Sequence, residues 1–127
     1  MNFILVFIGG GIGSLLRYAL GRFFSTKFFA LGYFPFGTLC VNLLGSFLIG
    51  FVGYFVANKL FSDDFRIFFI IGILGGFTTF SSFGLEVFNM LEHKDYLKMI
   101  LYVLGTNFFG IILVSGGWWL SKTIQGL

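Results

Sequence analysis

The chain has little charge, a single cysteine and a single proline. Charged residues make up 10% of the 127 residues, against about 25% in an ordinary soluble domain, which argues against a soluble globular protein. Cys40, having no second cysteine in the chain, can form neither an intrachain disulfide nor a metal cluster. The net charge of +3 comes from basic residues scattered between apolar runs, where lipid headgroups attract them, so we expect no nucleic-acid partner.

Hydrophobic residues, in contrast, make up 57% of the chain. A membrane-spanning helix needs about 20 mainly apolar residues. Four segments of that kind are present, at about 3–23, 35–57, 66–91 and 96–120, with short connections between them. The sequence therefore predicts an all-α integral membrane protein, a single domain of four transmembrane helices that crosses the lipid bilayer several times.

The basic residues between the spans favour neither orientation in the membrane. With four spans, Lys59, Arg66 and Lys122 share one side, and Arg22, Lys27, Lys94 and Lys98 share the other. Because an excess of Lys and Arg on one side sets orientation, a count of three against four predicts insertion both ways. Inverted copies can pair about an axis in the membrane plane, so we predict an antiparallel, dual-topology homodimer. A fixed topology with a weak charge signal is the alternative.

The stretch GGFTTFSSF, residues 75–83, places glycines and hydroxyl side chains inside the third apolar segment. Glycine weakens a helix, and non-helical backbone in a bilayer is tolerated only where it is buried in protein or lines a cavity. We therefore predict that the third helix is broken near its middle, at Gly75 and Gly76. Carbonyls freed before such a break suit a cation, and N–H groups after it suit an anion.

Polar residues beyond this break follow a helical pattern. Thr79, Ser82 and Glu86 fall at positions i, i+3 and i+7, which predicts a polar track on one helix face. Phe80 and Phe83 lie three residues apart on a neighbouring face. Hydroxyl groups can instead bond to their own helix, but several of them directly after a Gly-Gly pair favour a site.

The other spans also contain polar residues whose roles stay open. Asn42 has two N–H donors and one carbonyl, so it can tie two helices together or bind an anion. Arg17 either reaches the headgroups or draws anions into a vestibule. Thr106 and Asn107 either complete a polar path or form hydrogen bonds between helices.

Three motifs, GGGIGSLLRY, GTLCVNLLGSFLIG and above all GGFTTFSSF, resemble the small bacterial fluoride channels, the Fluc or CrcB family, over essentially the whole chain. The resemblance implies an antiparallel homodimer of four-helix subunits in the bacterial plasma (inner) membrane. It also implies two fluoride pores that export fluoride passively from the cytoplasm and give fluoride resistance. A structural sodium ion at the centre of the dimer is the implied cofactor.

The resemblance further implies roles for individual residues. Asn42 matches the pore asparagine, and Phe80 and Phe83 match two phenylalanines that face fluoride. The backbone carbonyls of Gly75 and Thr78 match the sodium ligands. Ser81, Ser82 and Glu86 match the track after the break, although relatives often carry Thr at the position of Ser82 and a hydroxyl at that of Gly84, so the track is expected to be shorter here. The expected pore residues are Asn42, Thr79, Phe80, Ser81, Ser82, Phe83, Glu86, Thr106 and Asn107, with Arg17 in the vestibule.

Other functions fit the sequence less well. A small multidrug-type, proton-coupled exporter has a similar dual-topology architecture, but it is expected to carry an acidic residue in the first span, and residues 3–23 contain no Asp or Glu. A non-transporting scaffold would explain the glycine rows but not the hydroxyl track. An enzyme is disfavoured because the lone His93 lies in a polar loop and no nucleophile–base set can be assembled.

Overall fold

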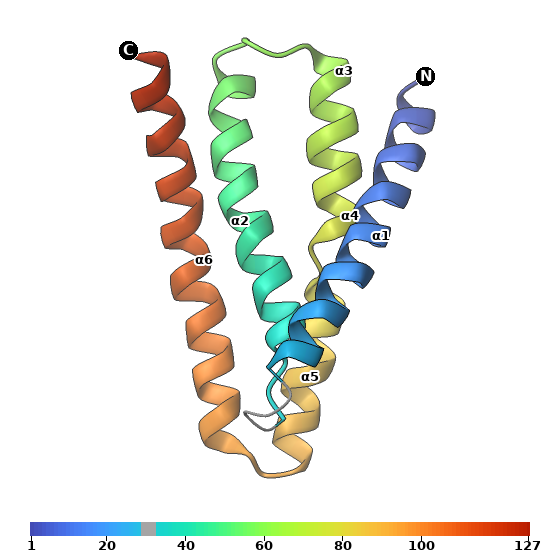
Figure 1. The fold of residues 1–127 in the computed structure, drawn as a ribbon, viewed down its shortest axis with the longest axis vertical. Coiled ribbons are helices and arrows are strands. Elements are labelled where there is room, and N and C mark those ends of the chain that lie inside the picture. Colours follow the sequence, from blue (N-terminus) through green and yellow to red (C-terminus); the bar gives the residue numbers. More distant parts are fainter. Residues whose placement is uncertain (29–32) are drawn as a thin grey trace.

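A computed structural model describes residues 1–28 and 33–127 of the chain (Figure 1). Within that part, four helical spans are long and apolar enough to cross a membrane. They are α1 (Asn2–Lys27), α2 (Phe36–Ala57), a third span (Asp63–Glu92) and α6 (Tyr96–Gln125). The four-span prediction is confirmed. Helix α6 continues past the expected end near residue 120 because helical structure does not have to stop where the apolar run stops.

The spans alternate in direction, as Figure 1 shows. Both chain termini and the connection between α2 and α3 lie at one end of the molecule, and the connection between α5 and α6 lies at the other. This alternation separates the basic residues of the loops into the two groups expected from the sequence.

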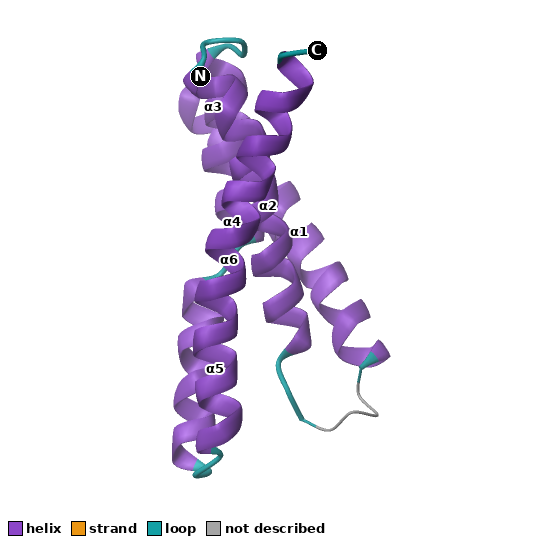
Figure 2. Ribbon diagram, turned by 90° about the vertical axis from the view of Figure 1, so that its left-hand side faces the viewer, coloured by secondary structure: helices purple, strands orange, loops and turns teal. Residues whose placement is uncertain are grey.

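The third span is a succession of short segments. These are α3 (Asp63–Arg66), the π-helical segment η2 (Ile67–Leu74), α4 (Gly75–Phe77) and α5 (Phe80–Glu92). Between α4 and α5, Thr78 (φ −79°, ψ 156°) and Thr79 (φ −147°, ψ 117°) are extended, so the helix is interrupted near its middle (Figure 2). The expected break is confirmed, but its predicted position was wrong, because Gly75 and Gly76 are helical.

Two glycines of the third span, Gly72 and Gly76, pack against α1, which explains the shift of the break. A methyl group on Gly9 would lie 2.5 Å from the carbonyl oxygen of Phe68, and one on Gly72 would lie 3.0 Å from the Cα of Gly9. Gly76 meets the backbone of Gly10 in the same way. Small residues allow this backbone approach where α1 crosses the third span (Figure 1). The glycines therefore make room for α1, and the chain leaves the helix only after Phe77.

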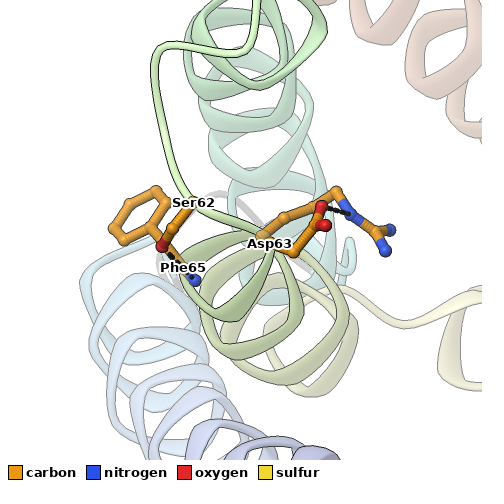
Figure 3. Close-up of polar contacts among 4 residues, drawn as sticks. Ser62, Asp63 and Phe65 are labelled. Atoms are coloured by element: carbon orange, nitrogen blue, oxygen red, sulfur yellow. Dashed lines mark hydrogen bonds and ion pairs between the residues drawn. The ribbon is translucent and has the colours of Figure 1, made fainter.

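Polar contacts mark the start of the third span (Figure 3). The Ser62 hydroxyl accepts a hydrogen bond of 3.2 Å from the Phe65 N–H, which satisfies one of the free donors at the helix start. Asp63 places a negative charge in the first turn, where the helix dipole favours it. The contact of 3.8 Å between Asp63 and Arg66 is exposed and contributes little.

Two contacts position α6 along the rest of the molecule. The buried Ser121 hydroxyl donates a 2.7 Å hydrogen bond to the carbonyl of Phe51 in α2. Nearer the other end, Phe83 and Met90 of α5 and Tyr102 of α6 form a buried apolar cluster. The first contact fixes α6 against α2, and the second packs α5 against α6, near most of the predicted site residues.

Candidate functional site at the broken helix

Asn42 of α2 holds the backbone of the break. Its Nδ2 donates to the Thr79 carbonyl at 3.0 Å, and the Thr79 N–H donates to its Oδ1 at 2.8 Å. Thr79 is only 7% exposed, so its backbone groups need protein partners. Asn42 is thus a tie between α2 and the third span, and an amide has two N–H donors, so one is left after this pairing.

The break also removes the helical donors of two carbonyl groups. In an α-helix the N–H of residue i+4 bonds to the carbonyl of residue i, so Gly75 would pair with Thr79. That N–H instead bonds to Asn42. In the same way the Ser82 N–H, which would pair with Thr78, donates to the Thr79 hydroxyl at 3.2 Å. The carbonyl oxygens of Gly75 and Thr78 therefore both lack their usual donors.

A groove of about 460 Å³ lies beside the break, between α2, the third span and α6. The predicted site residues that line it are Asn42, Gly75, Thr78, Thr79, Phe80, Phe83, Thr106 and Asn107. The two phenylalanines differ in environment: Phe80 is 81% exposed, whereas Phe83 is 8% exposed and packs edge-on against Tyr102. Their ring centroids lie 5.6 Å apart.

The two predicted site residues of α6, Thr106 and Asn107, differ in their hydrogen bonding. The buried Thr106 hydroxyl has no hydrogen-bond partner among the described residues, which is uncommon for a buried polar atom. Asn107 donates to the carbonyl of Val103 in its own helix at 2.8 Å and makes no side-chain hydrogen bond to another helix within residues 1–28 and 33–127. The Thr106 hydroxyl is thus a free donor at the groove wall.

Arg17 belongs to a second hollow of about 340 Å³ between α1, α2 and the start of α5. Arg22 and the track residue Ser82 also line this hollow, and Thr79 borders both hollows. The structure therefore brings Arg17 beside the hydroxyl groups of the break, at a place that suits the predicted vestibule. Ser81 lines neither hollow: it is exposed, and its hydroxyl lies 3.4 Å from that of Thr79.

Glu86 also lines neither hollow and is held by two hydroxyl groups from neighbouring helices. Thr38 of α2 donates to Oε1 at 2.7 Å, and Tyr102 of α6 donates to Oε2 at 2.6 Å. Thr38 is not among the site residues predicted from the sequence. A signal existed, because Thr38 lies four residues before Asn42 and thus on the same face of α2.

Comparison with known proteins shows similarity along the whole chain. A family model described as "CrcB-like protein, Camphor Resistance (CrcB)" matches residues 4–118. The fluoride-specific ion channel FluC of Helicobacter pylori strain J99 is 51% identical over 100% of this chain and 99% of the relative. That of strain HPAG1 is 50% identical over the same shares of both chains. The FluC protein of Hydrogenobaculum sp. strain Y04AAS1 is 41% identical over 92% of this chain and 94% of the relative.

Helical spans locate such a chain in the membrane. With four of them it is a multi-pass membrane protein, and in bacteria that means the inner membrane, because the proteins that span the outer membrane are β-barrels. The matched region covers nearly all of α1 to α6 and includes the break. The chain belongs to the CrcB-like family.

Proposed function

We propose that this protein is a fluoride-selective ion channel through which fluoride leaves the cytoplasm passively, which gives fluoride resistance. Relatives that match almost the whole chain are named fluoride-specific ion channels. The observation that carries the proposal is the break itself, where the start of α5 meets a groove whose lining includes two spare donors, the second Nδ2–H of Asn42 and the Thr106 hydroxyl. On this proposal the protein is a channel and not an enzyme.

Fluoride is small and strongly hydrated, so a pore must replace its water with other donors. The second Nδ2–H of Asn42 and the unpaired Thr106 hydroxyl supply such donors at the groove. The ring edge of Phe80 is electropositive and can approach an anion. Among the groove-lining residues that the structure describes, none is basic, which favours passage over tight binding.

From the break, the proposed path leads along the start of α5 to the second hollow. Ser81 and Ser82 supply hydroxyl groups, and Ser82 borders this hollow together with Arg17. The guanidinium charge of Arg17 attracts anions toward it. Glu86 lies further along the same helix, where its carboxylate accepts from hydroxyl groups of α2 and α6 and so orders the end of the track.

The functional unit in this proposal is an antiparallel homodimer with dual topology. The groove is open on the protomer surface, and both Gly75 and the large apolar side chain of Phe80 are exposed there. A second copy in the opposite orientation would cover this surface. The near-equal loop charge, three basic residues against four, supports insertion in both orientations.

A structural sodium ion is part of the same proposal. The carbonyls of Gly75 and Thr78 lack their helical donors, and both residues line the exposed groove. Uncharged carbonyl oxygens suit a hard monovalent cation, and a two-fold axis would double the two oxygens of one subunit to four. The residues present therefore fit a sodium ion, which would supply a positive charge at the break.

The test is ion efflux from liposomes that contain only the purified protein. Fluoride efflux should be fast without a proton gradient, and chloride efflux should equal that of protein-free liposomes. Equal rates for the two anions would contradict the proposal. Efflux that requires a proton gradient would instead favour the proton-coupled exporter.

A further inference from the structure

We propose that Asn42 positions the cation site: by capturing the Thr79 N–H, it keeps the Gly75 carbonyl free for the ion. This inference rests on the sodium ion of the proposed function and assigns Asn42 a role besides that of a fluoride donor. Asn42 does not touch the cation in this arrangement. It acts through the backbone of the break.

The first step concerns the conformation of Thr79. The Asn42 amide pairs with both the N–H and the carbonyl of this residue, as a neighbouring β-strand would. Thr79 has ψ 117°, whereas a helical residue has ψ of about −42°. A return to helix would rotate both groups away from Asn42. The two hydrogen bonds therefore stabilise the extended conformation against the helical one.

The second step concerns the remaining polar groups of the break. The Thr79 hydroxyl accepts from the Ser82 N–H, and the Thr78 hydroxyl donates to the carbonyl of Leu74 at 3.0 Å. The N–H, the carbonyl and the hydroxyl of Thr79 all have partners, and none of these partners is Gly75. The Gly75 carbonyl loses its helical donor for the same reason that Thr79 stays extended.

The third step is the close approach of α2. Gly45 is buried, and a methyl group on it would collide with the Thr78 side chain and lie 3.5 Å from a ring carbon of Phe77. The absence of a side chain at Gly45 lets α2 lie against the break, within hydrogen-bonding distance of Thr79. Gly45 thus sets the distance between α2 and the break that the hydrogen bonds of Asn42 require.

Linkage follows from these steps. A cation at the Gly75 carbonyl and the Asn42 side chain at the Thr79 N–H stabilise the same broken conformation, so each favours the other. Without Asn42, the Thr79 N–H can pair with the Gly75 carbonyl again, and the cation must compete with a helical hydrogen bond. Removing Asn42 should therefore weaken sodium binding.

The experiment uses the full-length protein in fluoride-free nanodiscs. It measures hydrogen exchange at the Thr79 amide and the rise in unfolding temperature as sodium replaces choline. Asn42→Leu keeps the branching of the side chain but loses both hydrogen bonds. At saturating sodium the ion occupies the Gly75 carbonyl, so the Thr79 N–H of this variant has neither partner and should exchange at least about tenfold faster than in the unmodified protein. The sodium concentration for half-maximal stabilisation should rise by at least about tenfold.

Two variants serve as matched comparisons. Asn107→Leu makes the same substitution in the same groove. The Asn107 side chain bonds to Val103 in its own helix and to no other described residue, so hydrogen exchange at Thr79 should stay as in the unmodified protein. Asn42→Asp keeps an oxygen that accepts from the Thr79 N–H, so it should restore most of the protection. If Asn42→Leu showed the same Thr79 exchange rate and the same stabilisation by sodium as the unmodified protein, the inference would be overturned. The proposed fluoride channel would not be affected by that result, because the experiment contains no fluoride.

The unmodified protein provides a further test if Asn42→Leu does not assemble. NMR coupling across the hydrogen bond should connect the Thr79 amide nitrogen to the side-chain carbonyl carbon of Asn42. Coupling to the backbone carbonyl of Gly75 would overturn the inference. An unmodified protein that sodium does not stabilise would overturn both the sodium site and this inference, whereas fluoride efflux would test the channel separately.

Discussion

Residues that look alike in the sequence differ in environment at the break. Phe80 and Phe83 belong to one motif, yet Phe80 is 81% exposed and Phe83 is 8% exposed. The ring of Phe83 is 5.0 Å from that of Tyr102 in an edge-on contact, while Phe80 faces the open groove. The two rings should therefore contribute differently to stability, even if both contact a passing anion.

Phe80→Ile should lower fluoride flux at least about tenfold, because the ring loses its electropositive edge. It should leave the unfolding temperature of the protomer nearly unchanged, because the ring is exposed in the protomer and makes little packing contact there. Phe83→Ile should also cost about 1–1.5 kcal/mol of stability, because a buried side chain changes shape. Liposome efflux and thermal unfolding measure the two effects. Phe88→Ile, an exposed phenylalanine of α5 outside both hollows, is the control. Full fluoride flux in Phe80→Ile would mean that the ring contributes only apolar packing and does not contact the anion.

Glu86 should depend on its two hydroxyl partners. Tyr102→Phe removes one donor from a partly buried carboxylate, which should cost about 1–3 kcal/mol of stability. Tyr96→Phe is the control, because Tyr96 is exposed. A double-mutant cycle between Tyr102→Phe and Glu86→Gln should give a coupling of at least about 0.5 kcal/mol. Additive effects in that cycle would show that the contact contributes nothing to stability.

At the scale of the helix, α1 and α2 have separate effects on the third span. Helix α1 approaches η2 and α4 at glycines and keeps them helical, whereas α2 provides Asn42 at Thr79 and stabilises the interruption. Two half-helices thus meet at the break, with carbonyls at the end of one and N–H groups at the start of the other. Their dipoles favour a cation on one side and an anion on the other.

The neighbouring glycines Gly75 and Gly76 should respond differently to the same substitution. Gly76→Ala places a methyl group against the backbone of Gly10, so it should destabilise the protomer by about 1–3 kcal/mol. Gly75→Ala meets only the carbonyl of Ile70, at 3.9 Å, and should leave the protomer fold intact. Because Gly75 lines the exposed groove, its variant should instead weaken dimerisation and the sodium response.

Thermal unfolding, together with single-molecule photobleaching in bilayers to count subunits, separates the two effects. From the sequence, both glycines are expected to form the break. Equal destabilisation by the two substitutions would contradict the separate roles of the two glycines, with Gly76 at the α1 contact and Gly75 at the groove.

At the scale of the whole molecule, one protomer leaves a groove open. Much of its outer surface is apolar, as expected for contact with lipid, but the groove combines that surface with Asn42, Thr106 and exposed backbone. A lipid chain offers these polar groups no hydrogen bonds, whereas an inverted copy would bring a second set of donors and carbonyls to the same place.

Dual topology should be visible by labelling the C-terminus from each side of the membrane. Both sides should label a comparable fraction of the molecules, because the loops differ by one basic residue, three against four. Adding three lysines to the loop of residues 58–62 should shift the population to one orientation and reduce fluoride efflux, since inverted partners become rare. A single orientation in the unmodified protein would remove the dual-topology proposal.

The sequence alone determined the number of spans and the presence of an interruption. Bilayer thickness sets the length of an apolar segment, so four such segments could be recognised without any knowledge of contacts. The motif at residues 75–83 predicted a break because glycine and hydroxyl groups are unfavourable in a continuous lipid-facing helix. The shared face of the polar residues after the break follows from helical periodicity.

The tertiary structure decided where the break lies and which groups remain free. Gly75 and Gly76 weaken a helix locally, but the contact between Gly76 and α1 keeps them helical, and Asn42 draws the Thr79 N–H out of the helix instead. Likewise, only packing brings Thr38 and Tyr102 to Glu86 and buries Phe83 while Phe80 stays exposed. Local propensity shows where a helix is weak, but hydrogen-bond partners from distant segments determine where it opens, because a buried N–H must be satisfied somewhere.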